Sequence, residues 1–282
     1  MKIAIIGTGR MGATLIRKLS AAGHAVRIAN SRGPDTIQDL ARETGTTAMT
    51  SAEAVQDVEL VIVSVPFHAM VTLKPLLNTV SNSVPIADTS NYLSSQDGHI
   101  EALDAGETES VWMQEQLGRP LIKAWNALVQ ATLQDKGKTK GEPGSLAVPV
   151  AGDDPEVKQI MMNLVEDTGF DAVDAGTIEE SWRIQAGSPA YCTELTAEEL
   201  AQALMLADRE AALKRRDAIG DIISSWPVDD AWSFDHVVAL HRAATRFPRQ
   251  REVAASRRGP DTGHGPLARR RGRAQSPATD ER

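Results

Sequence analysis

The first twelve residues constrain the fold more than any other part of the chain. An apolar run at residues 2–6 leads into a G-x-G-x-x-G motif and then into a helix-like stretch. A strand, a glycine turn and a helix N-terminus in this order are typical of a dinucleotide-binding βα unit. The helix N-terminus offers unpaired N–H groups and a positive dipole end to phosphates. The motif therefore favours a dinucleotide site over a glycine-rich turn without a ligand, and its residues are Gly7, Thr8, Gly9, Arg10, Met11 and Gly12.

The three glycines of this motif have different expected tasks. Gly7 allows the tight turn, and Gly9 lets a pyrophosphate approach the backbone because it has no side chain. Gly12 lets the helix pack closely on the strand.

The segment after the second expected strand, residues 25–29, indicates which dinucleotide binds. Sites that prefer NAD carry Asp or Glu there, whereas this chain has Asn30, Ser31 and Arg32. Asn and Ser can donate to a 2′-phosphate, and Arg can pair with it through a charge-assisted fork. We therefore expect NADP(H) rather than NAD(H); the alternative is that Arg32 is a solvated loop charge.

Composition limits the class of protein and its compartment. No apolar run in the 282 residues approaches the roughly 20 needed to span a bilayer. The first strand begins at the N-terminus, which leaves no room for a signal peptide. The single cysteine, Cys192, excludes an internal disulfide, and the histidines lack metal-ligand spacing. We expect a cytoplasmic protein without a metal and without a membrane partner.

The net charge of −8 hides a basic C-terminal segment. Residues 239–282 contain eleven Arg and four acidic residues, about +7, and the segment from residue 256 is rich in Arg, Gly and Pro. Such a composition buries little apolar surface, so we expect disorder from about residue 250. A solvated appendage is favoured over nucleic-acid binding, because the tail has no interleaved aromatic residues.

Alternating strand and helix patterns predict the fold class. Strand-like runs lie at 2–6, 25–29, 60–63, 84–87, 120–124, 146–151 and 170–173, with helical segments between them. This alternation predicts a Rossmann-type α/β fold, a doubly wound and mostly parallel sheet of about eight strands with a small C-terminal helical extension. We place the NADP(H)-binding domain at 1–217, with one helix at 196–217, and an uncertain extension at 218–282.

Ligands of doubly wound sheets bind outside the carboxyl ends of the strands, where the loops at 7–12, 30–34, 64–69, 88–92 and 125–130 should converge. Pro66 would fix the backbone there, and His68 could donate to the cofactor or simply cap a surface helix. Asn126 is a candidate polar contact. Asp88 and Asn91 could contact ribose or substrate, or form only the turn into the next helix.

No catalytic acid/base pair can be identified from spacing. Tyr191 could reach the pocket, although packing is the favoured interpretation, and Cys192 is a poor nucleophile because no base adjoins it. We therefore assign no catalytic residue. Hydride transfer between two bound redox cofactors needs orientation and exclusion of water more than protein acid/base groups.

Over residues 1–217 the chain resembles the NADPH-dependent reductases of the deazaflavin coenzyme F420 and their bacterial dinucleotide-binding relatives. The resemblance rests on the motifs IIGTGRMG, NSR at 30–32, SVPFHA, DTSNY, KAWN, LAVPVAGDD, GFDAVDAG and ESWRIQAGSPAY. It implies hydride transfer between NADP(H) and a deazaflavin or flavin ring. It also implies that the protein forms a homodimer and binds small redox molecules.

The resemblance also implies roles for individual residues. The phosphates would contact Thr8, Arg10 and Met11, and the 2′-phosphate would contact Ser31 and Arg32. The cofactor would be flanked by Val65, Pro66 and His68. The nicotinamide would lie near Ala124 and Asn126.

Two other functions remain open at this point. β-Hydroxyacid and imine reductases begin with similar glycine turns, but they usually add a long all-helical domain, and only some 65 residues follow Asp217. A non-catalytic NADP(H) sensor would also be compatible with the missing acid/base pair.

Overall fold

The computed structural model describes residues 1–226 and 233–245. The disorder expected from about residue 250 concerns residues outside these ranges. Within them, no helix is both long and apolar enough to cross a membrane.

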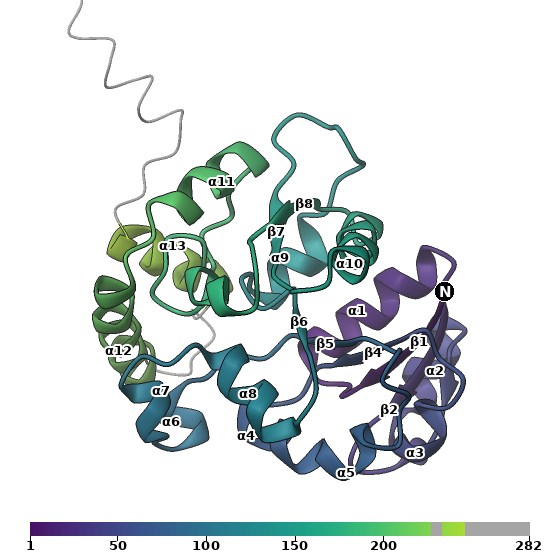
Figure 1. The fold of residues 1–282 in the computed structure, drawn as a ribbon. Helices are drawn as coiled ribbons and strands as arrows, with labels where there is room; N and C mark the ends of the chain where they lie inside the picture. Colours follow the sequence, from purple (N-terminus) through teal and green to yellow (C-terminus); the bar gives the residue numbers. More distant parts are fainter. Residues whose placement is uncertain (227–232, 246–282) are drawn as a thin grey trace, which may run out of the picture. The chain divides into compact units, whose positions relative to one another are not determined.

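A six-stranded parallel sheet forms the N-terminal part of the molecule (Figure 1). The strand order is β3-β2-β1-β4-β5-β6, so the chain moves outward from β1 in one direction and then returns to extend the sheet in the other. This reversal is the doubly wound topology that the sequence predicts. The strands are β1 (Lys2–Ile6), β2 (Ala25–Ala29), β3 (Thr47–Ala48), β4 (Leu60–Val63), β5 (Ile86–Asp88) and β6 (Ile122–Lys123).

Both faces of this sheet are covered by helices, and the alternation along β1 shows how. Ile3 and Ile5 belong to one hydrophobic cluster, whereas Ala4 and Ile6 belong to the other. Successive side chains of a strand point to opposite faces, so a strand buried on both faces is apolar throughout. This burial explains the unbroken apolar runs of the central strands.

The first cluster is covered by α1 (Arg10–Ala21), α2 (Gln38–Thr44), α9 (Gln130–Asp135) and α10 (Pro155–Asp167). The second is covered by α3 (Ser51–Ala54), α4 (Phe67–Met70), α5 (Lys74–Leu77), α7 (Glu101–Asp104) and α8 (Glu109–Leu117). The remaining short elements are η1 (Pro34–Ile37), η2 (Val71–Leu73), α6 (Ser94–Asp97) and η3 (Glu179–Ile184).

A second, two-stranded parallel sheet holds the last two strands, β7 (Ala147–Val150) and β8 (Asp171–Asp174). The described residues thus contain eight strands, as expected, but divided between two sheets. An isolated antiparallel bridge between Lys123 and Ala151 connects β6 to the residue after β7. Hydropathy alone gives no sign of this division, because it does not encode which strands pair with each other. Between them, Asp154 caps α10 by accepting from the backbone N–H groups of Glu156 and Val157.

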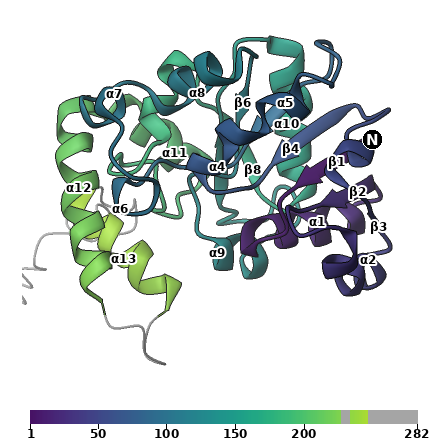
Figure 2. The same cartoon turned by 90° about the horizontal axis from the view of Figure 1, so that it is seen from below.

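The C-terminal part is helical and differs from the single helix expected at 196–217. Two helices are present, α11 (Ala197–Met205) and α12 (Arg209–Ser225), because Asp208 accepts from the N–H of Ala211 and starts a new helix. α12 continues past Asp217, the residue at which we expected the domain boundary. α13 (Phe234–Thr245) packs beside α12 (Figure 2).

A buried ion pair joins the ends of β5 and β6. Lys123 Nζ lies 2.6 Å from Asp88 Oδ2, and neither side chain is more than 1% exposed. Asp88 Oδ1 accepts from the backbone N–H and the hydroxyl of Ser90. These bonds satisfy the carboxylate and fix the turn that begins the 88–92 loop.

We predict that Lys123→Met destabilises the protein by about 3 kcal/mol, because it leaves the Asp88 carboxylate buried without its counter-ion. Adding Asp88→Asn should restore most of the loss, since the amide still accepts from Ser90. Guanidinium unfolding of the wild type and the single and double variants measures both effects. Equal stability of all three proteins would contradict this account.

Candidate functional site

The glycine loop between β1 and α1 is shaped by two close backbone approaches. Gly7 has φ +107°, and a Cβ there would lie 2.1 Å from the carbonyl oxygen of Ser64. A Cβ on Gly12 would lie 2.1 Å from the carbonyl oxygen of Gly7. At Gly9 a Cβ would meet no atom within 4 Å, and the backbone is ordinary, with φ −67°. The protein's own packing therefore requires Gly7 and Gly12 but leaves open space at Gly9.

Asn30 ties the loop after β2 to the glycine loop. Its Nδ2 donates to the hydroxyls of Thr8, at 3.2 Å, and Thr36, at 3.0 Å. Its Oδ1 accepts from the backbone N–H of Arg32 at 2.9 Å. Asn30 thus holds the loop in shape, while Ser31 and Arg32 are exposed at the same edge of the sheet.

The loop after β4 adjoins the glycine loop through its backbone. Ser64 N donates to Ile6 O, and Val65 Cγ1 would lie 3.0 Å from a Cβ on Gly7. Pro66 is the N-cap residue of α4. His68 lies within α4, where its Nδ1 is 2.8 Å from Asp97 Oδ1, and its side chain is half exposed. The imidazole is therefore paired with a carboxylate and does not line the cavity described next.

A cavity of about 480 Å³, the central cavity, lies beside the carboxyl ends of β5 and β6. This volume is within the roughly 300–1,000 Å³ that is typical of small-molecule sites. One side, the sheet-edge wall, comes from Met11 of α1 and from the loops after β5 and β6. The other side, the helical wall, comes from Ile219 and Ile223 of α12 and from Phe234, Val237 and His241 of α13.

Asn126 presents a hydrogen-bond acceptor in the sheet-edge wall. Its Nδ2 donates to Asn91 Oδ1, at 3.1 Å, and to the carbonyl of Ile184, at 2.9 Å. Because a carbonyl can only accept, this bond fixes the orientation of the amide. The Oδ1 of Asn126 is buried and has no partner among the described residues, although the residue lines the central cavity. A buried polar atom without a partner destabilises a protein, so this oxygen is a candidate ligand contact.

Two residues that line the central cavity have left-handed backbone conformations. Trp125 has φ +57° and Cys192 has φ +54°. Bulky residues rarely adopt this conformation, and those that do cluster at functional sites. The N–H of Cys192 donates to Ala127 O at 2.9 Å, which connects the two segments.

Burial suppresses the chemistry of the cysteine and tyrosine in the cavity. Burial raises the pKa of the Cys192 thiol to about 12 and the pKa of the Tyr191 hydroxyl well above its usual value. Both groups therefore stay protonated near neutral pH, and a protonated thiol is a poor nucleophile.

Arg216 and Glu109 are buried charged residues that the sequence did not bring to attention. Arg216 of α12 lines the central cavity, where it donates to Leu103 O and to Asp217 and lies over the ring of Tyr92. Burial raises the pKa of Glu109, whose Oε2 accepts from Tyr92 N. Glu109 lines a separate, smaller cavity, so it does not provide an acid group in the central one.

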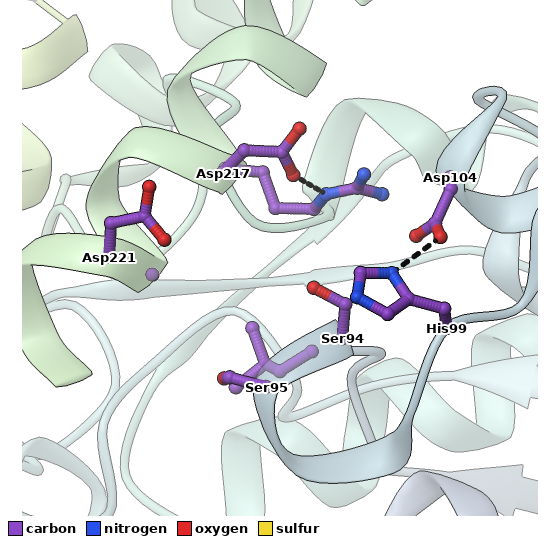
Figure 3. A pocket seen from close by; sticks show the side chains of 9 residues that line it. Ser94, Ser95, His99, Asp104, Asp217 and Asp221 are labelled. Carbon is purple, nitrogen blue, oxygen red and sulfur yellow. Dashed lines mark hydrogen bonds and ion pairs between the residues drawn. The ribbon is translucent and has the colours of Figure 1, made fainter.

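Figure 3 shows a second cavity of about 360 Å³, the aspartate-lined cavity. Its lining shares Leu93, Ser95, Arg216 and Gly220 with the central cavity. Asp217 and Asp221 reach it from α12, and His99 is paired there with Asp104 at 2.9 Å. Three carboxylates would repel phosphate groups, so this cavity does not suit the phosphates of a dinucleotide.

The structure brings the predicted residues together to different degrees. The loops that contain residues 7–12, 30–32 and 65–68 lie after β1, β2 and β4, at the carboxyl edge of one sheet. Met11 and Asn126 line the central cavity, whereas Ala124 is fully buried with its side chain in the core. His241 and Arg216 line the same cavity but lie over 80 residues beyond Asn126, and no local motif distinguishes them.

Comparison with known proteins supports the resemblance seen in the sequence. Residues 2–92 match the family described as NADP oxidoreductase, coenzyme F420-dependent. The protein YjhV of Escherichia coli K12 is 49% identical over 70 residues, which are 25% of this chain and 51% of that protein. The chain thus spans about half the length of this curated relative.

Solved structures are similar over a larger part of the chain. The hypothetical protein SMa0349 from Sinorhizobium meliloti is 27% identical over 70% of this chain and 95% of its own, with a TM-score of 0.60. A protein from Arthrobacter sp. FB24, provisionally described as an F420-dependent NADP reductase, is 24% identical over 63% of this chain and 86% of its own, with a TM-score of 0.51. The second likeness concerns the fold alone. The resemblance is thereby confirmed for residues 2–92, which are similar to the coenzyme F420-dependent NADP oxidoreductases.

Proposed function

We propose that this protein is an NADPH-dependent oxidoreductase that transfers a hydride between NADP(H) and a deazaflavin or flavin. One observation carries the nucleotide part of this proposal. Gly7 and Gly12 are required by contacts within the protein, but the space beside Gly9 is open. A glycine that no internal contact requires, at the N-terminus of α1, suits the approach of a pyrophosphate to the backbone.

The choice of NADP(H) rests on the loop after β2. Residues 30–32, directly after β2, contain no carboxylate, and Ser31 and Arg32 are exposed there. Asn30 Oδ1 holds the backbone N–H of Arg32, so the start of the loop is ordered before a ligand arrives. An exposed guanidinium can pair with a 2′-phosphate by two charge-assisted bonds.

The central cavity suits the reacting rings. When bound, NADPH supplies the hydride. Met11, Leu128 and Val129 provide apolar contact surface in the sheet-edge wall. Asn126 Oδ1 can accept from an N–H group, such as that of the nicotinamide carboxamide, and so orient the ring. Hydride transfer between two rings needs this orientation more than a protein acid or base.

The glycine geometry predicts different outcomes for the same substitution at two positions. Gly9→Ala should leave stability nearly unchanged, because its Cβ meets no protein atom, but should weaken NADPH binding at least tenfold. Gly12→Ala should destabilise the fold by about 1–3 kcal/mol, because its Cβ would overlap the Gly7 carbonyl. Guanidinium unfolding and NADPH fluorescence titration measure the two effects. Wild-type NADPH affinity in Gly9→Ala would count against the site.

Arg32→Ala should weaken NADPH binding roughly 10- to 100-fold, the loss expected for a charge-assisted hydrogen bond. Affinity for NADH should change little, because NADH has no 2′-phosphate. Arg42→Ala is the control, since Arg42 is also an exposed arginine but lies within α2 and is paired with Asp39. A wild type that binds NADH as tightly as NADPH would overturn the assignment.

The acceptor is tested by following NADPH absorbance with purified protein and a panel of F420, FMN, FAD, riboflavin, simple carbonyls and imines. We expect oxidation only with ring-type acceptors. Oxidation only with carbonyls or imines would identify a reductase of those groups instead. Tight NADPH binding without oxidation by any acceptor would indicate a sensor.

A further inference from the structure

His241 places an unsatisfied polar group in the helical wall of the central cavity. The residue is 3% exposed, it lines the cavity, and its Nδ1 has no hydrogen-bond partner among the described residues. Buried polar side-chain atoms usually have partners in folded proteins. An imidazole nitrogen that lacks one beside a cavity is therefore a candidate contact for a ligand.

The surroundings of His241 keep its ring neutral and fixed in place. The edge of the ring meets Tyr191, with ring centroids 5.0 Å apart and planes at 61°. Burial lowers the pKa of His241 to about 4, so the imidazole is uncharged at neutral pH. The other ionisable groups of the cavity wall are Tyr191 and Cys192, which are also uncharged, and Arg216, which pairs with Asp217. A neutral imidazole has one donor nitrogen and one acceptor nitrogen.

Polar contacts hold α13 against the rest of the cavity. Arg242 Nε donates to Thr193 O at 2.7 Å, and its Nη2 is 3.0 Å from Glu194 Oε2. Lys136 Nζ lies 3.1 Å from Asp235 Oδ1. The position of His241 is therefore set by contacts on both sides of it along the helix.

The two walls of the cavity divide the reactants between them. The cofactor of the proposed reaction would approach from the sheet-edge wall, because the glycine loop lies at that edge. The second reactant then faces the helical wall, which includes His241. A neutral imidazole among apolar side chains suits an uncharged polar edge with N–H or C=O groups, such as the dione end of a flavin or deazaflavin ring, better than a charged group.

We propose that His241 is a specificity-determining residue that forms a hydrogen bond with the uncharged polar edge of the hydride acceptor, so that α13 completes the acceptor site. This inference rests on the proposed oxidoreductase function. It assigns a ligand contact to a part of the chain that lies outside the family match at residues 2–92.

The test measures binding of riboflavin, an uncharged flavin, by quenching of its fluorescence in the presence of saturating NADP⁺. His241→Phe keeps a ring against Tyr191 but removes both nitrogens, and should weaken riboflavin binding roughly three- to tenfold. His241→Asn places an amide near the position of Nδ1 and should recover most of the affinity. NADP⁺ affinity should stay within about twofold of the wild type in both variants, because His241 would contact only the acceptor.

His236→Gln is the matched control, since His236 lies on the same helix but is exposed and does not line the cavity. Unchanged riboflavin affinity in His241→Phe would overturn the inference, as would equal losses for riboflavin and NADP⁺, or no riboflavin binding by the wild type. Failure of the wild type to bind NADP⁺ would instead overturn the proposed function, and this inference with it.

A measurement on the wild type keeps the inference testable if His241→Phe does not fold. The imidazole ¹⁵N resonances of His241, recorded with NADP⁺ alone and then with added riboflavin, should shift on riboflavin addition. Resonances of His236 should not move. Unmoved His241 resonances at saturating riboflavin would rule out the contact.

Discussion

The close approach of α1 to the edge of the sheet is the constraint on which the site depends. The carbonyl of Gly7 occupies the space that a side chain at Gly12 would need, and the carbonyl of Ser64 does the same at Gly7. Three segments therefore meet backbone to backbone: the end of β1, the start of α1 and the residue after β4. This contact orients the N-terminus of α1 toward the carboxyl edge of the sheet. The adjoining loops, including the one held by Asn30, lie around this N-terminus.

The central cavity combines a conventional Rossmann edge with a wall that the family match does not cover. On the sheet-edge wall, polar atoms are held by a network in which Asn91 and Asn126 bond to each other. On the helical side, α12 and α13 contribute apolar residues, Arg216 and one neutral histidine to the cavity lining. In the proposed reaction the sheet-edge wall would orient one ring and the helical wall would contact the other, which is the alignment that direct hydride transfer requires.

The sequence predicted the fold wherever the signal was local. The glycine motif and the apolar runs are short local patterns, and each lies within a few residues of the element that it predicted. The division into two sheets was missed, because β7 and β8 pair with each other through contacts that hydropathy does not encode. The break between α11 and α12 was missed because apolar spacing continues across residues 206–208, although Asp208 is itself a recognisable N-cap residue.

The candidate site was predictable only on its sheet-edge side. Met11 and Asn126 follow strands at positions that topology assigns to the ligand edge. Arg216 and His241 belong to helices whose amphipathic patterns look like ordinary packing, and only the tertiary structure brings them to the cavity. Burial, and not sequence context, also determines that Cys192 stays a thiol and that His241 stays neutral.

The contact between Arg10 and Phe234 has a consequence for biosynthesis. The guanidinium of Arg10, in the first turn of α1, lies 5.7 Å from the ring centroid of Phe234, at the start of α13. A ribosome makes the glycine loop first and the helical wall more than 200 residues later. A nascent chain can therefore form the glycine loop before α12 and α13 exist, but the wall of the central cavity that these helices provide forms only after they are made. Until then the emerging polypeptide lacks the helical surface against which a second reactant would bind.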